Sequence, residues 1–231
     1  MRNSSRWAGA MLALAMLQCG SPAGAQEQGA PTTSSFLAVG AKTQPINGWT
    51  VFCQRYFPEC ETKPLEPRTM TLDADAWSLL QSVNAEINDT VESVTDADHW
   101  GIAEQWDYPL DGRGDCEDYV LAKRKRLMEL GAPRQALLIT VVLDTSGAGH
   151  AILIVRMDRG DFVLDNLTST IKPWSQTGYR YLKMQSQEDP NTWLGITSDE
   201  TTPVAASARP PRAASLARLH PGPRNAMAKA R

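Results

Sequence analysis

Hydrophobic positions recur at a helical period in the first half of the chain. Between residues 71 and 94 they are spaced three and four apart, which is the pattern of an amphipathic helix packed on a core. The positions are Trp77, Leu80, Val83, Ile87, Val91 and Val94. Thr71 is expected to cap the start of this helix.

A second helix is predicted from Cys116 to about Leu130. Asp115 can serve as its N-cap, and Gly131 with Pro133 ends it. Its apolar positions are Val120, Leu121, Leu127 and Leu130. The segment before it, residues 96–114, is rich in aromatic residues and glycine and is expected to form an ordered loop over a site.

Short apolar runs rich in β-branched residues predict four strands. They cover Leu137–Leu143, His150–Met157, Asp161–Asp165 and Tyr179–Met184. Short turns between consecutive strands, such as residues 146–149, favour antiparallel pairing. The predicted fold class is therefore α+β, with the cysteine-bearing helix packed on an antiparallel sheet.

The first 25 residues have the pattern of a signal peptide. Arg2 and Arg6 precede a short apolar run from Ala8 to Leu17, which is too short to span a bilayer. Ala23-Gly24-Ala25 predicts cleavage before Gln26 and export to the periplasm. An uncleaved anchor is the alternative. A lipoprotein at Cys19 is disfavoured, because Gln18 stands where a small residue is expected.

The remaining chain divides by composition into three parts. Residues 26–45 are rich in Gly, Thr, Ser, Pro and Gln and are expected to be a flexible leader. Residues 46–198 form one predicted domain, and residues 199–231 a disordered basic tail rich in Pro, Ala and Arg. The formal net charge of −3 gives no indication of a nucleic-acid partner.

Three cysteines remain after removal of the predicted signal. Cys53 and Cys60 are close in sequence and are expected to form a loop disulfide, although two unpaired buried thiols are also compatible with the spacing. Cys116 is then the free thiol. It follows Gly-Asp at a predicted helix start, where the helix dipole and free amide groups stabilise a thiolate. These features make Cys116 a candidate nucleophile, as opposed to a structural thiol.

His150 and Asp165 are the candidate partners of this thiol. His150 opens a predicted strand after a glycine-rich turn, and Asp165 ends the following strand, so antiparallel pairing brings the two together. A carboxylate there can orient the imidazole as the base of a Cys-His-Asp triad. His99 is the competing histidine, and a turn residue is the alternative role for Asp165.

Three motifs together resemble the bacterial transglutaminase-like cysteine peptidases. They are Gly114–Tyr119 (GDCEDY), Gly149–Leu153 (GHAIL) and Val163–Leu167 (VLDNL). The resemblance extends over about residues 49–193. It implies a papain-like core, cysteine peptidase activity, and catalytic roles for Cys116, His150 and Asp165. It also implies a periplasmic protease of a surface adhesin, with an inner-membrane receptor as a regulatory partner.

The acidic residues around Cys116 raise an electrostatic question. Asp115, Glu117 and Asp118 crowd the nucleophile, and nearby like charges oppose a thiolate. The resemblance implies calcium dependence, with Asp115 and Glu117 as ligands and Asp118 as a further oxygen donor. The alternative is that these are ordinary acids at a helix N-terminus, where negative charge is favourable.

Other functions fit the same residues. The triad could transfer an acyl group to an amine in place of water, or the chain could be a non-catalytic calcium-binding module or a papain-type general protease. Trp100, Trp106 and Tyr108 are expected either to line a substrate groove or to pack in the core.

Overall fold

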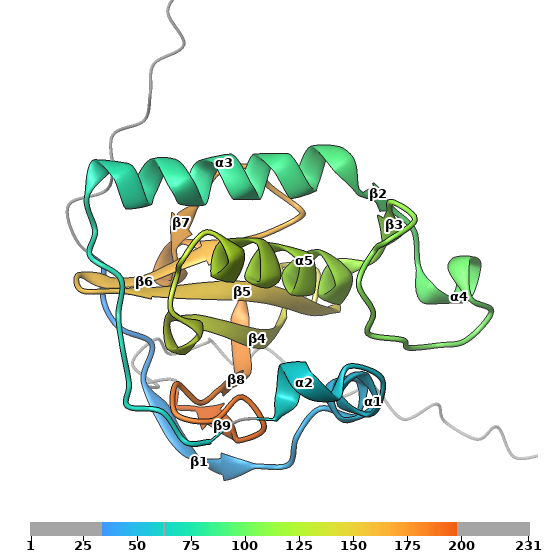
Figure 1. The fold of residues 1–231 in the computed structure, drawn as a ribbon, viewed down its shortest axis with the longest axis horizontal. Helices are drawn as coiled ribbons and strands as arrows, with labels where there is room; N and C mark the ends of the chain where they lie inside the picture. Colours follow the sequence, from blue (N-terminus) through green and yellow to red (C-terminus); the bar gives the residue numbers. More distant parts are fainter. Residues whose placement is uncertain (1–33, 62, 198–231) are drawn as a thin grey trace, which may run out of the picture. The chain divides into compact units, whose positions relative to one another are not determined.

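A computed structural model describes residues 34–61 and 63–197. Its main feature is a seven-stranded sheet in which all neighbouring strands are antiparallel (Figure 1). In spatial order the strands are β1 (Val39–Thr43), β9 (Trp193–Ile196), β8 (Arg180–Gln185), β4 (Leu137–Leu143), β5 (Gly149–Met157), β6 (Gly160–Leu164) and β7 (Lys172–Pro173).

Two long helices cover one face of this sheet. Helix α5 (Cys116–Glu129) packs on β5, and α3 (Ala74–Thr90) packs on α5 (Figure 1). The shorter elements are α1 (Asn47–Arg55), α2 (Phe57–Cys60), β2 (Glu92–Ser93), α4 (Asp96–His99), β3 (Arg113–Gly114), and the 3-10 turns Arg134–Ala136 and Trp174–Gln176. The predicted α+β class, with the cysteine-bearing helix on an antiparallel sheet, is confirmed.

The start of the first long helix differs from the prediction. Asp73, not Thr71, is the N-cap, and its side chain accepts a hydrogen bond from the amide of Ala76. The helix ends at Thr90, so Val91 and Val94 lie beyond it. Both continue the apolar spacing, but main-chain pairing with the segment around β3 takes Val94 out of the helix.

The expected flexible leader contains a strand, so that prediction is wrong for its second half. Residues 39–43 form β1, which pairs with β9 at the edge of the sheet. The sequence of β1, VGAKT, has no run of buried apolar residues, because this edge strand exposes most of its side chains. The predicted signal peptide and the whole of the predicted basic tail lie outside the described residues. Among the described residues, no helix is long and apolar enough to cross a membrane.

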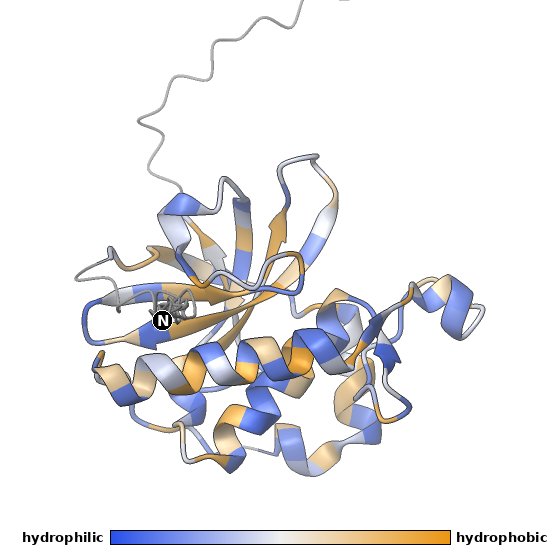
Figure 2. Cartoon of the chain, turned by 90° about the horizontal axis from the view of Figure 1, so that it is seen from above, coloured by the Kyte–Doolittle hydropathy of each residue, from blue (hydrophilic) through white to orange (hydrophobic). Residues whose placement is uncertain are grey.

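The core lies on both faces of the sheet. Leu121 of α5 packs in one buried cluster with Leu153 and Val155 of β5. Ile152 and Ile154 belong to a second cluster on the opposite face of the sheet. Figure 2 shows hydrophobic residues concentrated in the strands and interspersed with hydrophilic ones along the helices. Strands with both faces covered explain why the sequence of β5 is a nearly continuous apolar run.

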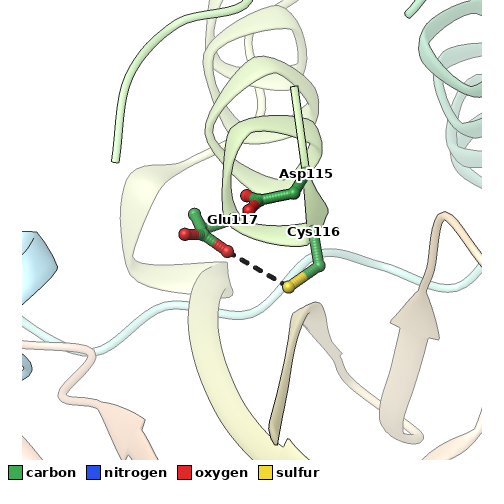
Figure 3. A group of neighbouring side chains, drawn as sticks. All are labelled: Asp115, Cys116 and Glu117. Atoms are coloured by element: carbon green, nitrogen blue, oxygen red, sulfur yellow. Dashed lines mark hydrogen bonds between the residues drawn. The ribbon is translucent and has the colours of Figure 1, made fainter. Parts of the chain in front are cut away.

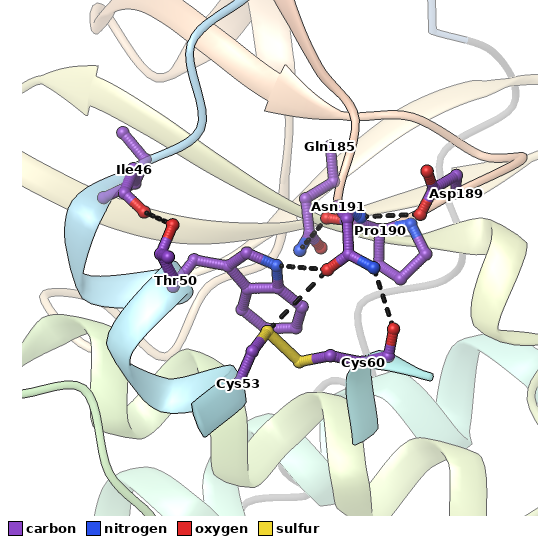
Figure 4. Close-up of a disulfide and its surroundings, with 9 residues drawn as sticks. Ile46, Thr50, Cys53, Cys60, Gln185, Asp189, Pro190 and Asn191 are labelled. Atoms are coloured by element: carbon purple, nitrogen blue, oxygen red, sulfur yellow. Dashed lines mark hydrogen bonds between the residues drawn. A yellow bond between two sulfur atoms is a disulfide. The ribbon is translucent and has the colours of Figure 1, made fainter. Parts of the chain in front are cut away.

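The predicted disulfide between Cys53 and Cys60 is present and joins α1 to α2. Asn191 connects this corner to the turn before β9 (Figure 4). Its side-chain amide donates to the carbonyl of Cys60 at 2.8 Å, and its Oδ1 accepts from Nε1 of Trp49 at 3.1 Å. The two short helices are therefore tied to the edge of the sheet next to β9.

Candidate active site

The Cys116 sulfur lies at the first residue of α5 and is partly exposed. It accepts a hydrogen bond from the amide of Ala151 at 3.4 Å, so it reaches the main chain directly after His150. The thiol also donates to Oε2 of Glu117 at 3.1 Å, and Figure 3 shows the Glu117 carboxyl group reaching toward the sulfur. The predicted free thiol is thus at a helix start and beside β5.

The surroundings of this thiol favour its neutral form. Burial raises the pKa of Cys116, and the Glu117 carboxylate raises it further. The hydrogen bond from the Ala151 amide acts in the opposite direction. Without further positive charge, the acidic neighbours therefore oppose the thiolate that the helix start favours.

His150 and Asp165 form a buried pair on neighbouring strands. Nε2 of His150 lies 2.9 Å from Oδ1 of Asp165. The β5–β6 register pairs Leu153 with Leu164, and the next step sets residue 165 opposite Ile152. His150 and Asp165 are then diagonal neighbours on one face of the sheet. The expected contact between these two residues is therefore present.

Both carboxylate oxygens of Asp165 accept hydrogen bonds. Oδ1 also accepts from the amide of Leu167 at 3.0 Å, and Oδ2 accepts from the hydroxyl of Tyr179 at 2.6 Å. Burial raises the pKa of Asp165, but the bonds from His150, Tyr179 and Leu167 outweigh it and hold the pKa below its ordinary value. The carboxylate is charged and fixed in orientation.

The Cys116 sulfur bonds to the main chain next to His150 but makes no direct hydrogen bond to its imidazole. Side chains alternate along β5, so His150 shares a face with Ile152, while Ala151 faces α5. Among the hydrogen bonds of the described residues, none joins Cys116 to the His150 ring. The thiol instead bonds to Glu117. The structure thus brings His150 and Asp165 into contact and sets the thiol next to the start of β5.

The predicted calcium ligands belong to a larger carboxylate cluster. Potential ligand atoms of Asp96, Asp115 and Asp118 lie within 4.8 Å of one another, as do those of Asp96, Glu104 and Glu117. Three buried oxygens of this cluster have no hydrogen-bond donor among residues 34–61 and 63–197: Oδ1 of Asp96, Oδ1 of Asp115 and Oε1 of Glu117. Acceptors buried together without donors fit a bound cation of the hard, oxygen-seeking type.

The pKa values of the cluster are raised. Burial raises the pKa of Asp118 to about 8, and burial with the charge of Asp115 raises that of Glu117. Burial also raises the pKa of Asp115 and of Asp96. Asp115 stands at the N-cap of α5, but its side chain makes no capping hydrogen bond.

Two members of the cluster, Asp96 and Glu104, were not among the ligands expected from the sequence. The parallel pairing of β2 with β3 sets Ser93 beside Gly114, so the residues that follow the two strands converge. The close approach also depends on Gly114, since a Cβ there would lie 2.6 Å from Oδ2 of Asp118. The available signal was the acidic content of residues 96–104, but only the pairing of two-residue strands reveals the convergence.

The aromatic residues of the loop have different positions. Trp106 and Tyr108 are buried in the core, whereas Trp100 is exposed and stacks on His99. His99 pairs with Asp111 at 2.8 Å and not with the thiol. Of the three aromatic residues proposed for a groove, two therefore pack in the core.

Two further features lie close to Asp165. A small pocket opens beside it, lined by Val163, Asp165, Thr168, Thr170, Lys172, Thr177 and Tyr179. Lys123, on α5, is fully buried, and its ammonium nitrogen has no hydrogen-bond partner among the described residues. Burial lowers the pKa of Lys123 to about 7, although the charge of Asp165 acts to raise it.

Comparison with solved structures finds LapG of Legionella pneumophila. The calcium-bound form has a TM-score of 0.46 and 24% identity, over 55% of this chain and 74% of LapG. An EGTA-treated form has a TM-score of 0.44 and 27% identity, over 53% of this chain and 68% of LapG. No curated protein sequence matches the chain.

The family model of the bacterial transglutaminase-like cysteine proteinases, BTLCP, matches residues 38–201. The match includes all three motifs from which the resemblance was drawn, and it covers most of the 231 residues. The chain therefore belongs to the bacterial transglutaminase-like cysteine proteinases and is a cysteine peptidase with their fold.

Proposed function

We propose that this peptidase hydrolyses peptide bonds of a protein substrate through Cys116, His150 and Asp165. The observation that carries the proposal is the buried pair of His150 and Asp165 at the strand ends beside the thiol-bearing start of α5. In a cysteine peptidase, a partly exposed thiol at a helix start is a nucleophile, and an imidazole oriented by a carboxylate is its base.

Each residue has a distinct role in this proposal. The Cys116 sulfur attacks the peptide carbonyl, and backbone amides at the start of α5 stabilise the oxyanion. Asp165 accepts from Nε2 of His150, which leaves Nδ1 free to take the thiol proton and pass it to the leaving amine. Water then hydrolyses the acyl-enzyme. The bond from Cys116 to Glu117 must open before the thiol can meet the imidazole.

We also propose that the carboxylate cluster binds calcium. Asp115 and Glu117 would hold the ion, with Asp118, Asp96 and Glu104 as further oxygen donors. The buried oxygens without donors support this assignment. A bound cation supplies positive charge beside the thiol, which favours the thiolate that the acidic neighbours otherwise oppose.

Labelling with iodoacetamide tests the triad. We expect Cys116 to be alkylated rapidly near neutral pH, and alkylation to slow strongly in His150→Ala. Mass spectrometry assigns the label, with Cys116→Ala as the control, because the disulfide leaves Cys53 and Cys60 unreactive. A labelling rate that does not change in His150→Ala would exclude the proposed base. Peptide-bond cleavage by the labelled and unlabelled protein then tests the reaction itself.

Calcium titration tests the cluster independently of activity. Isothermal calorimetry of chelator-treated protein is expected to show binding that is lost in Asp115→Asn combined with Glu117→Gln. Asp73→Asn is the matched control, because Asp73 caps α3 outside the cluster. Equal calcium affinity in the wild type and the double variant would rule out these ligands.

The proposed location and substrate rest on the resemblance to the family and on the signal-like pattern of residues 1–25. We propose that residues 1–25 are a cleaved signal and residues 199–231 a basic tail, and that the peptidase domain, predicted to begin at residue 46, begins with β1 at Val39 and extends to about residue 198. Periplasmic export, cleavage of a surface adhesin and control by an inner-membrane receptor are proposed on the same basis. Cell fractionation with an antibody to the mature protein tests the export: retention of the full-length chain in the cytoplasm would contradict it.

A further inference from the structure

The carboxylate of Asp165 receives more donors than orientation of one imidazole requires. Its two oxygens accept from three separate segments: the start of β5, the turn at Leu167, and Tyr179 just before β8. Only the hydroxyl of Tyr179 bonds to Oδ2. Without it, the described hydrogen bonds hold the carboxyl group through Oδ1 alone, and rotation about its terminal bond is less restricted.

Tyr179 also contacts the imidazole. Its ring meets the His150 ring edge to face, with centroids 5.8 Å apart and planes at 81°. This geometry is favourable for an aromatic pair. One side chain with two rotatable angles therefore touches both members of the proposed acid–base pair.

The main chain around Tyr179 is held by its own turn. Gly178 has a φ of +75°, a conformation that favours glycine, and the amide of Tyr179 donates to Oγ1 of Thr177 at 3.2 Å. The hydroxyl of Thr177 donates in turn to the carbonyl of Trp174 at 2.9 Å. This turn fixes the position from which the phenol reaches Asp165.

We propose that Tyr179 is a positioning residue of the active site. Its hydroxyl holds the plane of the Asp165 carboxylate, and its ring holds the imidazole of His150, so that Nδ1 keeps one orientation toward the thiol. The proposal rests on the proposed roles of Asp165 and His150. The bond from Tyr179 also favours the ionised carboxylate, so its loss raises the pKa of Asp165.

The test measures alkylation of Cys116 by iodoacetamide against pH in calcium-containing buffer. Tyr179→Phe keeps the ring and removes the hydroxyl, whereas Tyr179→Leu removes both contacts. We expect roughly a tenfold slower reaction at neutral pH for Tyr179→Phe, since a hydrogen bond to a charged group is lost. The acidic limb of its profile is expected to move to higher pH, and Tyr179→Leu to react more slowly still.

Tyr181→Phe is the matched control. Tyr181 lies two residues along; its hydroxyl donates to the carbonyl of Trp174, lies 3.0 Å from Oγ1 of Thr177, and bonds to neither Asp165 nor His150. We expect its pH profile to match the wild type. A Tyr179→Phe profile that superimposes on the wild type would overturn the proposal, and so would an equal loss in Tyr181→Phe, which would indicate general damage to the turn.

A second readout does not depend on the thiol. In a Cys116→Ser background, the proton on Nε2 of His150 is expected to give a downfield NMR signal that shifts or broadens in Tyr179→Phe and not in Tyr181→Phe. His150→Ala and Asp165→Asn separate the two levels of the proposal. If these two variants alkylate like the wild type, the proposed triad fails. If they are slow while Tyr179→Phe is normal, only the role of Tyr179 fails.

Discussion

Asp165 and the carboxylate cluster around Asp115 and Glu117 are both buried, but their pKa values are shifted in opposite directions. Asp165 accepts three hydrogen bonds, and its pKa is held below the ordinary value. In the cluster around Asp115 and Glu117, carboxylates face one another, several oxygens have no donor, and burial raises the pKa values. Burial is common to both groups, so the supply of donors decides the charge state. The donors to Asp165 come from the chain itself, whereas the proposed calcium ion would supply the positive charge that the cluster lacks.

The largest expected effect comes from Asp165→Asn. The amide can donate to the imidazole and so favour the wrong tautomer of His150. We expect Cys116 reactivity and peptidase activity to fall about 10³–10⁴-fold, the scale on which loss of an orienting carboxylate acts in such triads. The measurement is the alkylation rate with calcium present. If reactivity falls by less than about tenfold, the Asp165 carboxylate does not orient the imidazole of His150.

Removal of calcium is expected to make stability depend on pH. Asp118 has a folded pKa of about 8, raised from 3.8, so the folded chain retains a proton that the unfolded chain has lost. Stability of the chelated protein therefore falls as pH rises from about 4 to 8, by several kcal/mol. Calcium should reverse this trend, because it binds the ionised carboxylates.

The corresponding measurement is urea unfolding at pH 5 and pH 8, with calcium and with chelator. Asp118→Asn should reduce the pH dependence in chelator, since the amide does not titrate, and the raised pKa values of Glu117, Asp115 and Asp96 should leave the remainder. If the chelated wild type is more stable at pH 8 than at pH 5, the carboxylates of the cluster do not repel one another as proposed.

Glu117→Gln tests whether negative charge in the cluster raises the pKa of the Cys116 thiol. The substitution removes a like charge 3.1 Å from the sulfur, so the pKa of Cys116 should fall. In chelator, alkylation at about pH 10, where Glu117 with its raised pKa of about 9 is ionised, is expected to speed up by about tenfold, the factor that corresponds to one pKa unit. With calcium the gain should disappear, because a ligand has been removed. Glu86→Gln is the control, a glutamate that pairs with Arg126 away from the site.

The smallest expected effect is stabilisation by Lys123→Met. The pKa of this buried lysine is lowered from 10.5 to about 7, so the folded state is penalised as pH falls through that range. Methionine carries no such penalty, and a gain of about 1–2 kcal/mol is expected, greater at pH 6 than at pH 9. Urea unfolding at the two pH values provides the measurement. A destabilised variant would show that the ammonium is needed as a partner for Asp165.

Local patterns in the sequence predicted the central elements well. The run at residues 137–143 is the strand β4 itself, and the helix predicted from Cys116 to about Leu130 is α5, which ends at Glu129. Continuous apolar runs and a helix stopped by Gly131 are short-range signals, so they can be read one segment at a time. The edge strand β1 and the two-residue strands β2 and β3 could not be predicted, because their formation depends on partners far away in the chain.

By itself, the sequence determined the residue types and their order: a thiol at a helix start, a histidine opening one strand, and an aspartate closing the next. The motifs around them were enough to indicate the family. Only the tertiary structure decided how charge and donors are distributed around those residues. It added Asp96 and Glu104 to the acidic cluster through the β2–β3 pairing, and it brought Tyr179 to Asp165. Hydrogen bonds and electrostatic repulsion act over a few ångströms in space, and distance along the chain does not reveal them.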